Sequence, residues 1–148
     1  MEPEYLRREF PRPFTRYAPI AESIVSENQQ QLTFIHNPIE DLNIPTCNDD
    51  LLSLLSQLIH HLEDNGIIYL HCWGGRGRAG LVGACLASLI FPEMSSIDIL
   101  DWVQRGYDTR LGAEYMPNGL KRSPQTQQQR VFVTEFVDNV HSERDEVK

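Results

Sequence analysis

The sequence predicts an α/β domain with a small, mainly parallel sheet flanked by helices. Three observations predict this fold class: a short β-prone run at 67–70, a glycine-rich loop directly after it, and an apolar stretch at 81–90 that is long enough for a buried helix. A strand-like run at 32–36 and a helical pattern from Asp49 precede them. In domains with this order of elements, the chemistry lies at the carboxyl ends of parallel strands, where the glycine-rich loop stands.

The amino-terminal part of the chain is expected to hold little regular structure. Prolines stand among charged and aromatic residues in the first twenty residues, so we expect 1–20 to be irregular. The polar residues 22–31 predict a short helix. The run 32–36 predicts a strand that ends before Pro38, and a loop over 39–48 follows it.

The middle of the chain carries the clearest helical pattern. Leucine and isoleucine residues recur at intervals of three and four after Asp49, and Gly66 is the expected stop signal. The apolar residues at 81–90 predict a second helix, which Pro92 ends.

The carboxyl-terminal third predicts two further helices. Ser95 or Ser96 would cap the first, and Pro124 stands near the start of the second. We expect 106–119 to be a connecting loop and 142–148 to be frayed.

Length and charge limit the classes of function. A chain of 148 residues has the size of one domain, so we expect a single domain over 1–148. The net charge of -8 argues against a general binder of nucleic acid or of membrane surfaces, which usually shows a basic face. Any anionic ligand must therefore be held locally.

Cysteine usage predicts a reducing compartment. Cys47, Cys72 and Cys85 are too few and too odd in number for a disulfide framework, and no amino-terminal apolar run resembles a signal peptide. No apolar stretch reaches the roughly 18 residues that a membrane span needs. We therefore expect a soluble, cytoplasmic protein.

The loop HCWGGRGRAG, residues 71–80, is the main candidate for a functional site. A glycine-rich turn that leads into a helix directs consecutive backbone N–H groups into one concavity, and the helix amino terminus adds partial positive charge. The planar guanidinium of Arg78 suits two oxygens of one anion. The expected phosphate-binding residues are Trp73, Gly74, Gly75, Arg76, Gly77 and Arg78.

Cys72 would lie at the floor of this anion cradle. The amide dipoles, the helix end and the arginine all favour an anion, so its pKa should fall from about 8.5 toward roughly 3.5 to 7.5, which makes it a thiolate nucleophile. A lone cysteine more often acts as a small buried hydrophobe. The surrounding loop favours the nucleophile over that interpretation.

Cys72 and Arg78, with five residues between them and His71 before them, resemble the signature of the cysteine-dependent protein tyrosine phosphatases. The form HCWGGRGR is most similar to the dual-specificity branch, near the cyclin-dependent kinase inhibitor phosphatase type. The resemblance covers about residues 34–137 and implies a tyrosine phosphatase-like fold. It also implies that the cysteine attacks phosphorus, that water cleaves the phosphocysteine, and that no metal or other cofactor takes part.

The family also carries a general acid on a loop upstream of the cysteine. The resemblance assigns Asp41 to this role, because Asp41 to Pro45 show the aspartate, two residues, apolar residue and proline of the family. One carboxyl group can protonate the leaving oxygen and later activate water. Glu40 is the second choice.

A third match lies at 123–129. It resembles the family segment whose glutamine helps to position the hydrolytic water, and both Gln129 and Gln125 fit that role. A polar, glutamine-rich helix start also arises from capping alone.

Two departures from the family pattern bear on activity. The family usually has serine or threonine directly after the arginine, where Ala79 stands here, so we expect slow hydrolysis of the phosphoenzyme. The second departure is at the amino terminus. Relatives carry one or two additional strands before the acid loop, whereas the residues before that loop here show few strand signals.

The leading hypothesis is a phosphomonoesterase that acts on phosphotyrosine, and on phosphoserine and phosphothreonine as an extension, in phosphorylated protein partners. The alternatives are an inositol phosphate or phosphoinositide phosphatase, since Arg76 stands where such enzymes carry a lysine, and a phosphate-binding pseudophosphatase. His60 and His61 lack partners at ligand spacing, which argues against a metal site.

Overall fold

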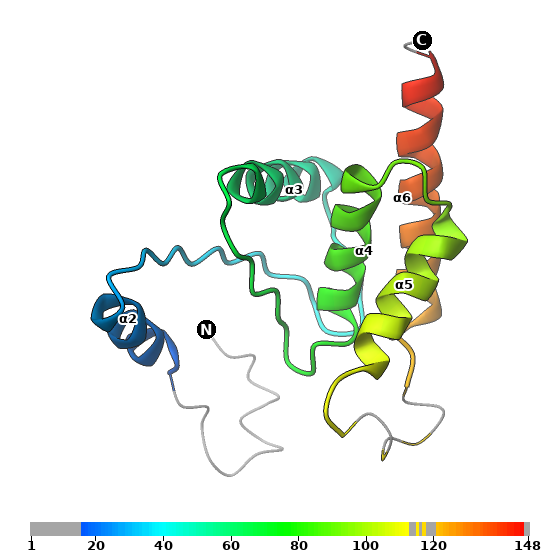
Figure 1. The fold of residues 1–148 in the computed structure, drawn as a ribbon. Helices are drawn as coiled ribbons and strands as arrows, with labels where there is room; N and C mark the ends of the chain where they lie inside the picture. Colours follow the sequence, from blue (N-terminus) through cyan, green and yellow to red (C-terminus); the bar gives the residue numbers. More distant parts are fainter. Residues whose placement is uncertain (1–15, 113–114, 116, 118–120, 147–148) are drawn as a thin grey trace. The chain divides into compact units, whose positions relative to one another are not determined.

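The computed structural model describes residues 16–112, 115, 117 and 121–146 (Figure 1). Contacts divide the chain into two compact units, Met1–His36 and Asn37–Lys148. The sequence analysis expected one domain over 1–148, and we describe the two units separately.

The first unit contains helix α2 (Ala18–Glu27), with a proline in its first turn. The helix expected over 22–31 therefore forms four residues earlier and begins inside the stretch that was expected to be irregular. The rest of that stretch, 1–15, lies outside the described residues. No residue of α2 is buried, and a contact between the rings of Tyr17 and Phe34, 6.3 Å apart, links its start to the extended segment that follows.

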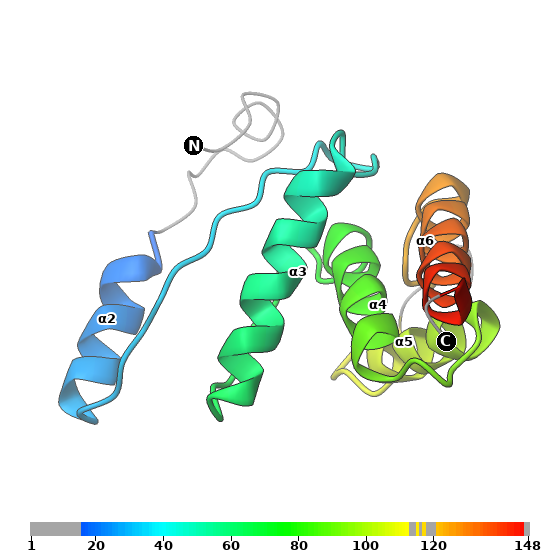
Figure 2. The same cartoon turned by 90° about the horizontal axis from the view of Figure 1, so that it is seen from above.

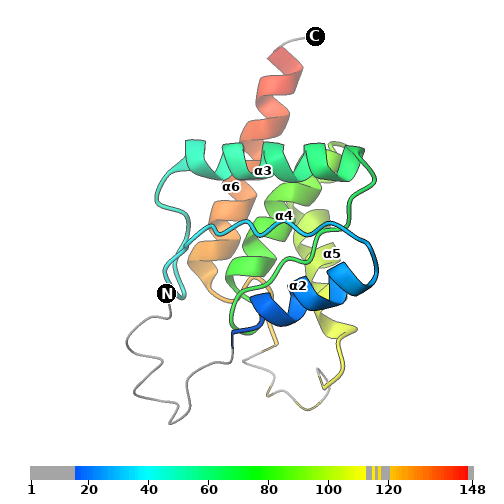
Figure 3. The same ribbon diagram turned by 90° about the vertical axis from the view of Figure 1, so that its left-hand side faces the viewer.

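The second unit contains four helices in its described part. They are α3 (Asn48–Glu63), α4 (Arg78–Ile90), α5 (Ser96–Asp108) and α6 (Gln127–Glu146). Helix α4 packs against each of the other three, and α5 also packs against α6. Figure 2 shows α4 between α3 and α6, and Figure 3 shows α3 lying across α4.

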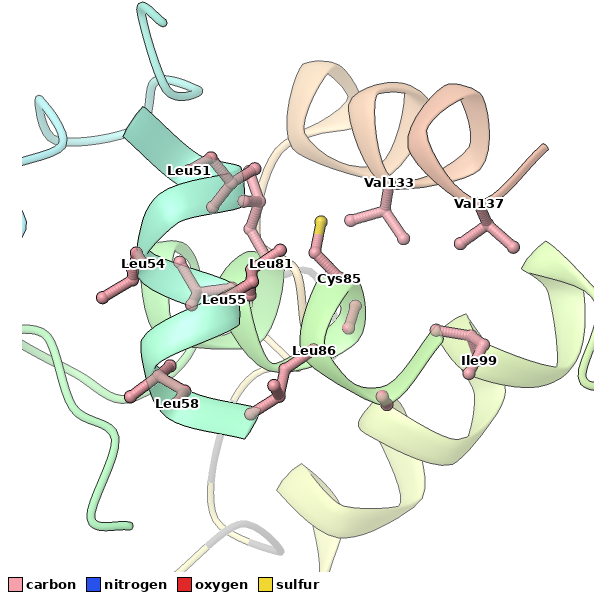
Figure 4. Close-up of a cluster of buried hydrophobic side chains, with 13 residues drawn as sticks. Leu51, Leu54, Leu55, Leu58, Leu81, Cys85, Leu86, Ile99, Val133 and Val137 are labelled. Atoms are coloured by element: carbon pink, nitrogen blue, oxygen red, sulfur yellow. The ribbon is translucent and has the colours of Figure 1, made fainter. Parts of the chain in front are cut away.

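The core of this unit is built on α4 (Figure 4). The leucine stripe of α3, which the sequence predicted, faces Leu81 and Leu86, while Cys85 faces α6. The fully buried side chains on the four helices include Leu51, Leu55, Leu81, Cys85, Ile99, Val133 and Val137.

The helix ends follow their local sequence signals. Ser95 caps α5 through a reciprocal capping box with Asp98, which confirms one of the two expected caps. Helix α3 stops slightly before Gly66, because Asn65 takes the left-handed conformation with φ 60°. Helix α5 extends to Asp108, into the expected loop, and α6 continues through Glu146, where fraying was expected.

The predicted parallel sheet is wrong: none of the described residues forms a strand, and the architecture there is helical. The runs 32–36 and 67–70 are extended but pair with nothing as strands. They belong to different contact units, and a strand gains stability only from a paired neighbour. Over the same part of the chain, no helix has the length and apolar character needed to cross a membrane.

Candidate active site

The glycine-rich loop joins the extended segment 67–70 to α4. Gly75 has φ 63°, a left-handed conformation that favours glycine. Gly77 is the amino-terminal cap of α4, so Arg78 is the first helical residue. A Cβ atom on Gly77 would lie 3.2 Å from side-chain atoms of Gln125 and Gln129, which shows how closely α6 approaches the loop.

Cys72 is half-buried within this loop. Burial raises the pKa of its thiol, but hydrogen bonds from the backbone N–H groups of Ala79, Arg76 and Gly75, together with the charge of Arg78, outweigh burial and lower the pKa overall. The amides of the loop and of the first turn of α4 thus converge on one sulfur atom. This arrangement favours a thiolate.

Arg78 connects the loop to the segment that carries Asp41. Its Nη2 lies 2.9 Å from Oδ1 of Asp41, and its Nη1 donates to the carbonyl of Ile39 over 3.2 Å. The side chain is 19% exposed, and its buried Nε has no hydrogen-bond partner. One buried guanidinium N–H is therefore left without a partner in the structure.

The loop around Asp41 distinguishes the two candidate acids. Glu40 accepts a hydrogen bond from Nδ2 of Asn43 over 2.8 Å, within a turn in which Leu42 has φ 65°. Asp41 instead pairs with Arg78, and its side chain is 41% exposed. The structure thus brings Asp41 to the loop arginine, while Glu40 is engaged inside its own turn.

The start of α6 holds this acid loop in place. Gln129 Nε2 donates to the carbonyl of Asn43 over 2.9 Å, and Thr126 Oγ1 donates to the carbonyl of Leu42 over 3.3 Å. Thr126 and Gln129 also form a reciprocal pair: each backbone N–H donates to the other side chain, over 3.1 Å in both cases. Gln129 is fully buried, so its amide is committed to these contacts.

Gln125 stands in a different environment from Gln129. Its side chain is partly exposed, and its Oε1 lies against Gly77. Of the two glutamines, Gln125 is therefore the one whose amide is accessible beside the loop.

A family model described as the DSP-PTPase phosphatase of polymorphic toxin systems matches residues 18–92, just over half of the chain. The chain belongs to this phosphatase family. The matched span of the chain includes Asp41, Cys72 and Arg78, and it ends before the two glutamines. Membership confirms the resemblance at the level of a dual-specificity-like family. The narrower similarity to the cyclin-dependent kinase inhibitor phosphatase type stays a prediction.

Curated relatives are consistent with this membership. The chain is 35% identical over 79 residues to protein 067L of Invertebrate iridescent virus 3, an alignment that covers 49% of the chain and 33% of that relative. It is 32% identical over 76 residues to protein 197R of Invertebrate iridescent virus 6, which covers 47% of the chain and 27% of that relative. Both relatives are named as tyrosine phosphatases. No solved structure matches the chain.

Sequence analysis did not predict the contacts on the outer side of the loop, although Ser123 belongs to the predicted match at 123–129. Ser123 Oγ donates to the carbonyl of Arg76 over 2.9 Å, and Arg110 Nη1 donates to the carbonyl of Gly74 over 3.1 Å. Gln104 accepts from the backbone N–H of Ser123 over 2.8 Å. No spacing signal marks these contacts, because they join segments far apart in the chain. Only the Thr-x-x-Gln pattern of Thr126 and Gln129 was readable as a capping signature.

Of the other residues that the sequence analysis discussed, Trp73 and Gly74 lie in the loop, and Cys85 and His60 lie on helices. Trp73 is 51% exposed and Gly74 is also exposed, whereas Cys85 is fully buried and burial raises its pKa to about 12. His60 lies near Glu63 and Asp64 on the exposed face of α3. Throughout the part of the chain that the structure describes, no group of three His, Cys, Asp or Glu side chains is placed to hold a metal ion.

Proposed function

We propose that this chain is a cysteine-dependent phosphomonoesterase that hydrolyses phosphotyrosine in proteins through a phosphocysteine intermediate. The observation that carries the proposal is the convergence of three backbone N–H groups on Cys72, beside an arginine that pairs with Asp41. Membership of the phosphatase family supports the same chemistry.

In the first step, Sγ of Cys72 attacks phosphorus while the bond between phosphorus and the ester oxygen breaks. Loop N–H groups and the free Nε–H of Arg78 hold the non-bridging oxygens. Asp41 donates its proton to the departing oxygen. In the second step, water attacks phosphorus, Asp41 takes the proton from that water, and the bond between sulfur and phosphorus breaks to restore the thiolate.

Substrate binding changes the partners of Arg78. The carboxylate of Asp41 holds Nη2 in the structure, and a phosphate group competes for the same guanidinium. Exchange of one anion for the other releases the Asp41 carboxylate, which then takes a proton from solvent and acts as the acid at the leaving oxygen. The arginine thereby couples phosphate binding to placement of the acid.

Ala79 favours a second candidate function, phosphate binding without efficient turnover. Its backbone N–H reaches Cys72, but its methyl side chain supplies no hydroxyl to stabilise the departing thiolate. We therefore expect the phosphoenzyme to accumulate.

Hydrolysis of p-nitrophenyl phosphate in the presence of a chelator tests the proposal. We expect a burst of nitrophenol that is stoichiometric with protein, followed by slower turnover, and Cys72→Ser should lower the rate by at least about 10³-fold. Cys47→Ser is the control, because that exposed cysteine lies at the start of α3. Absence of hydrolysis, with vanadate binding that depends on Arg78, would instead identify a phosphate-binding module.

The substrate class is tested with phosphopeptides and inositol phosphates at equal concentration. Higher kcat/KM for phosphotyrosine peptides than for phosphoserine and phosphothreonine peptides supports the proposal. A clear preference for inositol phosphates, to which Arg76 would contribute charge, contradicts it.

A further inference from the structure

The outward side of the phosphate-binding loop raises a separate physical requirement. When successive N–H groups turn toward one anion, their carbonyl groups turn away from it, and each buried carbonyl needs a donor. In an α-helix, the backbone N–H groups of the next turn donate to these carbonyl groups. In the loop before α4, other segments of the chain must do so.

Ser123 supplies one of these donors. It is only 4% exposed, and its Oγ donates to the carbonyl of Arg76 over 2.9 Å. The contact leaves no spare room, because a Cβ atom on Gly80 would collide with the Ser123 hydroxyl. Absence of a side chain at Gly80 is therefore what allows this hydroxyl to reach the loop.

A second set of contacts fixes Ser123 itself. Its backbone N–H donates to Oε1 of Gln104 over 2.8 Å. Nε2 of Gln104 in turn donates to the carbonyl of Lys121 over 2.7 Å and to Asp108 over 3.0 Å. The side chain of Gln104 therefore uses both ends to hold the segment that carries Ser123 against α5.

We propose that Ser123 is a positioning residue, whose hydroxyl holds Arg76 so that the loop amides stay directed at Cys72. The backbone of Arg76 makes both contacts: its carbonyl accepts from Ser123, and its N–H donates to the sulfur of Cys72. A restraint on the carbonyl therefore also restrains the direction of the N–H. The inference rests on the proposed function, because it assigns Ser123 a role in maintaining the thiolate.

Ser88 offers a matched control for the loss of a buried serine hydroxyl. Its Oγ donates to the carbonyl of Cys85 over 2.9 Å, and the residue is fully buried within α4. Ser88→Ala removes the same type of hydrogen bond as Ser123→Ala, but away from the loop. Both variants should lose comparable stability, and only Ser123→Ala should affect the sulfur.

The experiment measures the rate of alkylation of Cys72 by iodoacetamide as a function of pH. Cys47→Ser serves as the background, and Cys85 does not interfere, because it is fully buried with a pKa of about 12. We expect Ser123→Ala to raise the apparent pKa, so that the alkylation rate at low pH falls by about threefold to tenfold, since one pKa unit is a tenfold change in thiolate. Ser88→Ala should leave the pH profile unchanged.

The outcomes separate the two proposals. If the thiol of the unaltered protein titrates at its ordinary pKa, the proposed function fails. If that pKa is low and Ser123→Ala has the profile of Ser88→Ala, the role of Ser123 is refuted while the proposed function stands. Should Ser123→Ala fail to fold, Gln104→Leu replaces it, because it frees the backbone of Ser123 and keeps the hydroxyl. A raised pKa in that variant supports the inference, and an unchanged pKa overturns it.

Discussion

Arg78 is the side chain at which the two parts of the candidate site meet. It begins α4, its charge helps to lower the pKa of Cys72, and it pairs with Asp41 over 2.9 Å. Its Nη1 also holds the backbone of the acid loop at Ile39. One guanidinium therefore contacts the loop that carries the proposed acid, adds charge beside Cys72 and keeps one N–H without a partner in the structure.

Asp41→Asn should separate acid catalysis from phosphate binding. We expect kcat for alkyl phosphates to fall by about 10² to 10⁴-fold, and kcat for p-nitrophenyl phosphate to fall much less, because nitrophenolate leaves without a proton. Inorganic phosphate should bind more tightly, since Arg78 loses a competing carboxylate. Steady-state kinetics with phosphate as a product inhibitor measures both effects.

Glu40→Gln is the matched control for that variant, because Glu40 is adjacent and its carboxylate binds Asn43. The control should keep the dependence on the leaving group unchanged. Equal losses in the two variants would contradict the assignment of Asp41.

Sequence analysis proposed those candidate site residues whose identity and spacing form motifs. Cys72, Arg78 and Asp41 were all proposed from motifs, and the structure brings them together. The contacts of Ser123 and Gln104 were not predicted, because a hydroxyl or amide that binds a distant carbonyl has no local pattern.

The amino terminus of α6 assigns different tasks to the two glutamines. Gln129 is fully buried, completes the reciprocal pair with Thr126 and holds the carbonyl of Asn43. Gln125 is partly exposed beside Gly77. Burial and hydrogen bonding therefore favour a structural role for Gln129, and we propose Gln125 as the glutamine that positions the hydrolytic water.

Alanine substitutions test this division. Gln129→Ala should lower the free energy of unfolding by about 1–3 kcal/mol, because it removes a cap and leaves buried groups without partners. Gln125→Ala should change stability little and slow hydrolysis of the phosphoenzyme, which lowers steady-state turnover without reducing the burst. Chemical denaturation and rapid-quench kinetics measure the two effects. The reverse pattern would exchange the two roles.

The helices of the second unit were predictable because their signals are local. Apolar residues at intervals of three and four on α3 face the core, and Ser95 and Asp98 cap α5 within four residues of sequence. Each signal acts within one or two helical turns. Neither requires knowledge of what packs nearby.

The strands were not predictable for the opposite reason. The run 67–70 has the alternation of a strand, with Ile68 and Leu70 packed on the core and Ile67 and Tyr69 exposed at 92% and 86%. Its composition alone gave no information on whether a neighbour would pair with it. Pairing is a long-range property, so β-prone residues made an extended segment without making a sheet.

The whole molecule links the ionisation of its cysteines to stability. The folded state lowers the pKa of Cys72, so between that lowered value and about 8.5 the unfolded chain binds a proton that the folded chain does not. The stabilising contribution of Cys72 is therefore present above about pH 8.5 and is lost as the pH falls through the folded-state pKa. Cys85 has the opposite sign, because its folded-state pKa is raised to about 12.

Denaturation across a pH series of Cys72→Ser and Cys85→Ala measures these contributions. The difference in unfolding free energy between the unaltered protein and Cys72→Ser should grow as the pH rises toward 8.5. The difference for Cys85→Ala should shrink between about 8.5 and 12, where only the unfolded chain loses the thiol proton. If the two differences in unfolding free energy changed with pH in the same direction, the assignment of opposite pKa shifts to Cys72 and Cys85 would be contradicted.

Helix α4 packs against each of the other helices described in its unit, and its first residue is Arg78. A substitution in the core face of α4 therefore has two effects. It shifts the helix and so moves Arg78, and it lowers stability and so the cellular abundance of the protein. A genetic screen that scores only loss of activity would mark core positions such as Leu81 as if they touched substrate. Dividing each score by the amount of intact protein would separate core positions, which act through abundance, from positions that contact substrate.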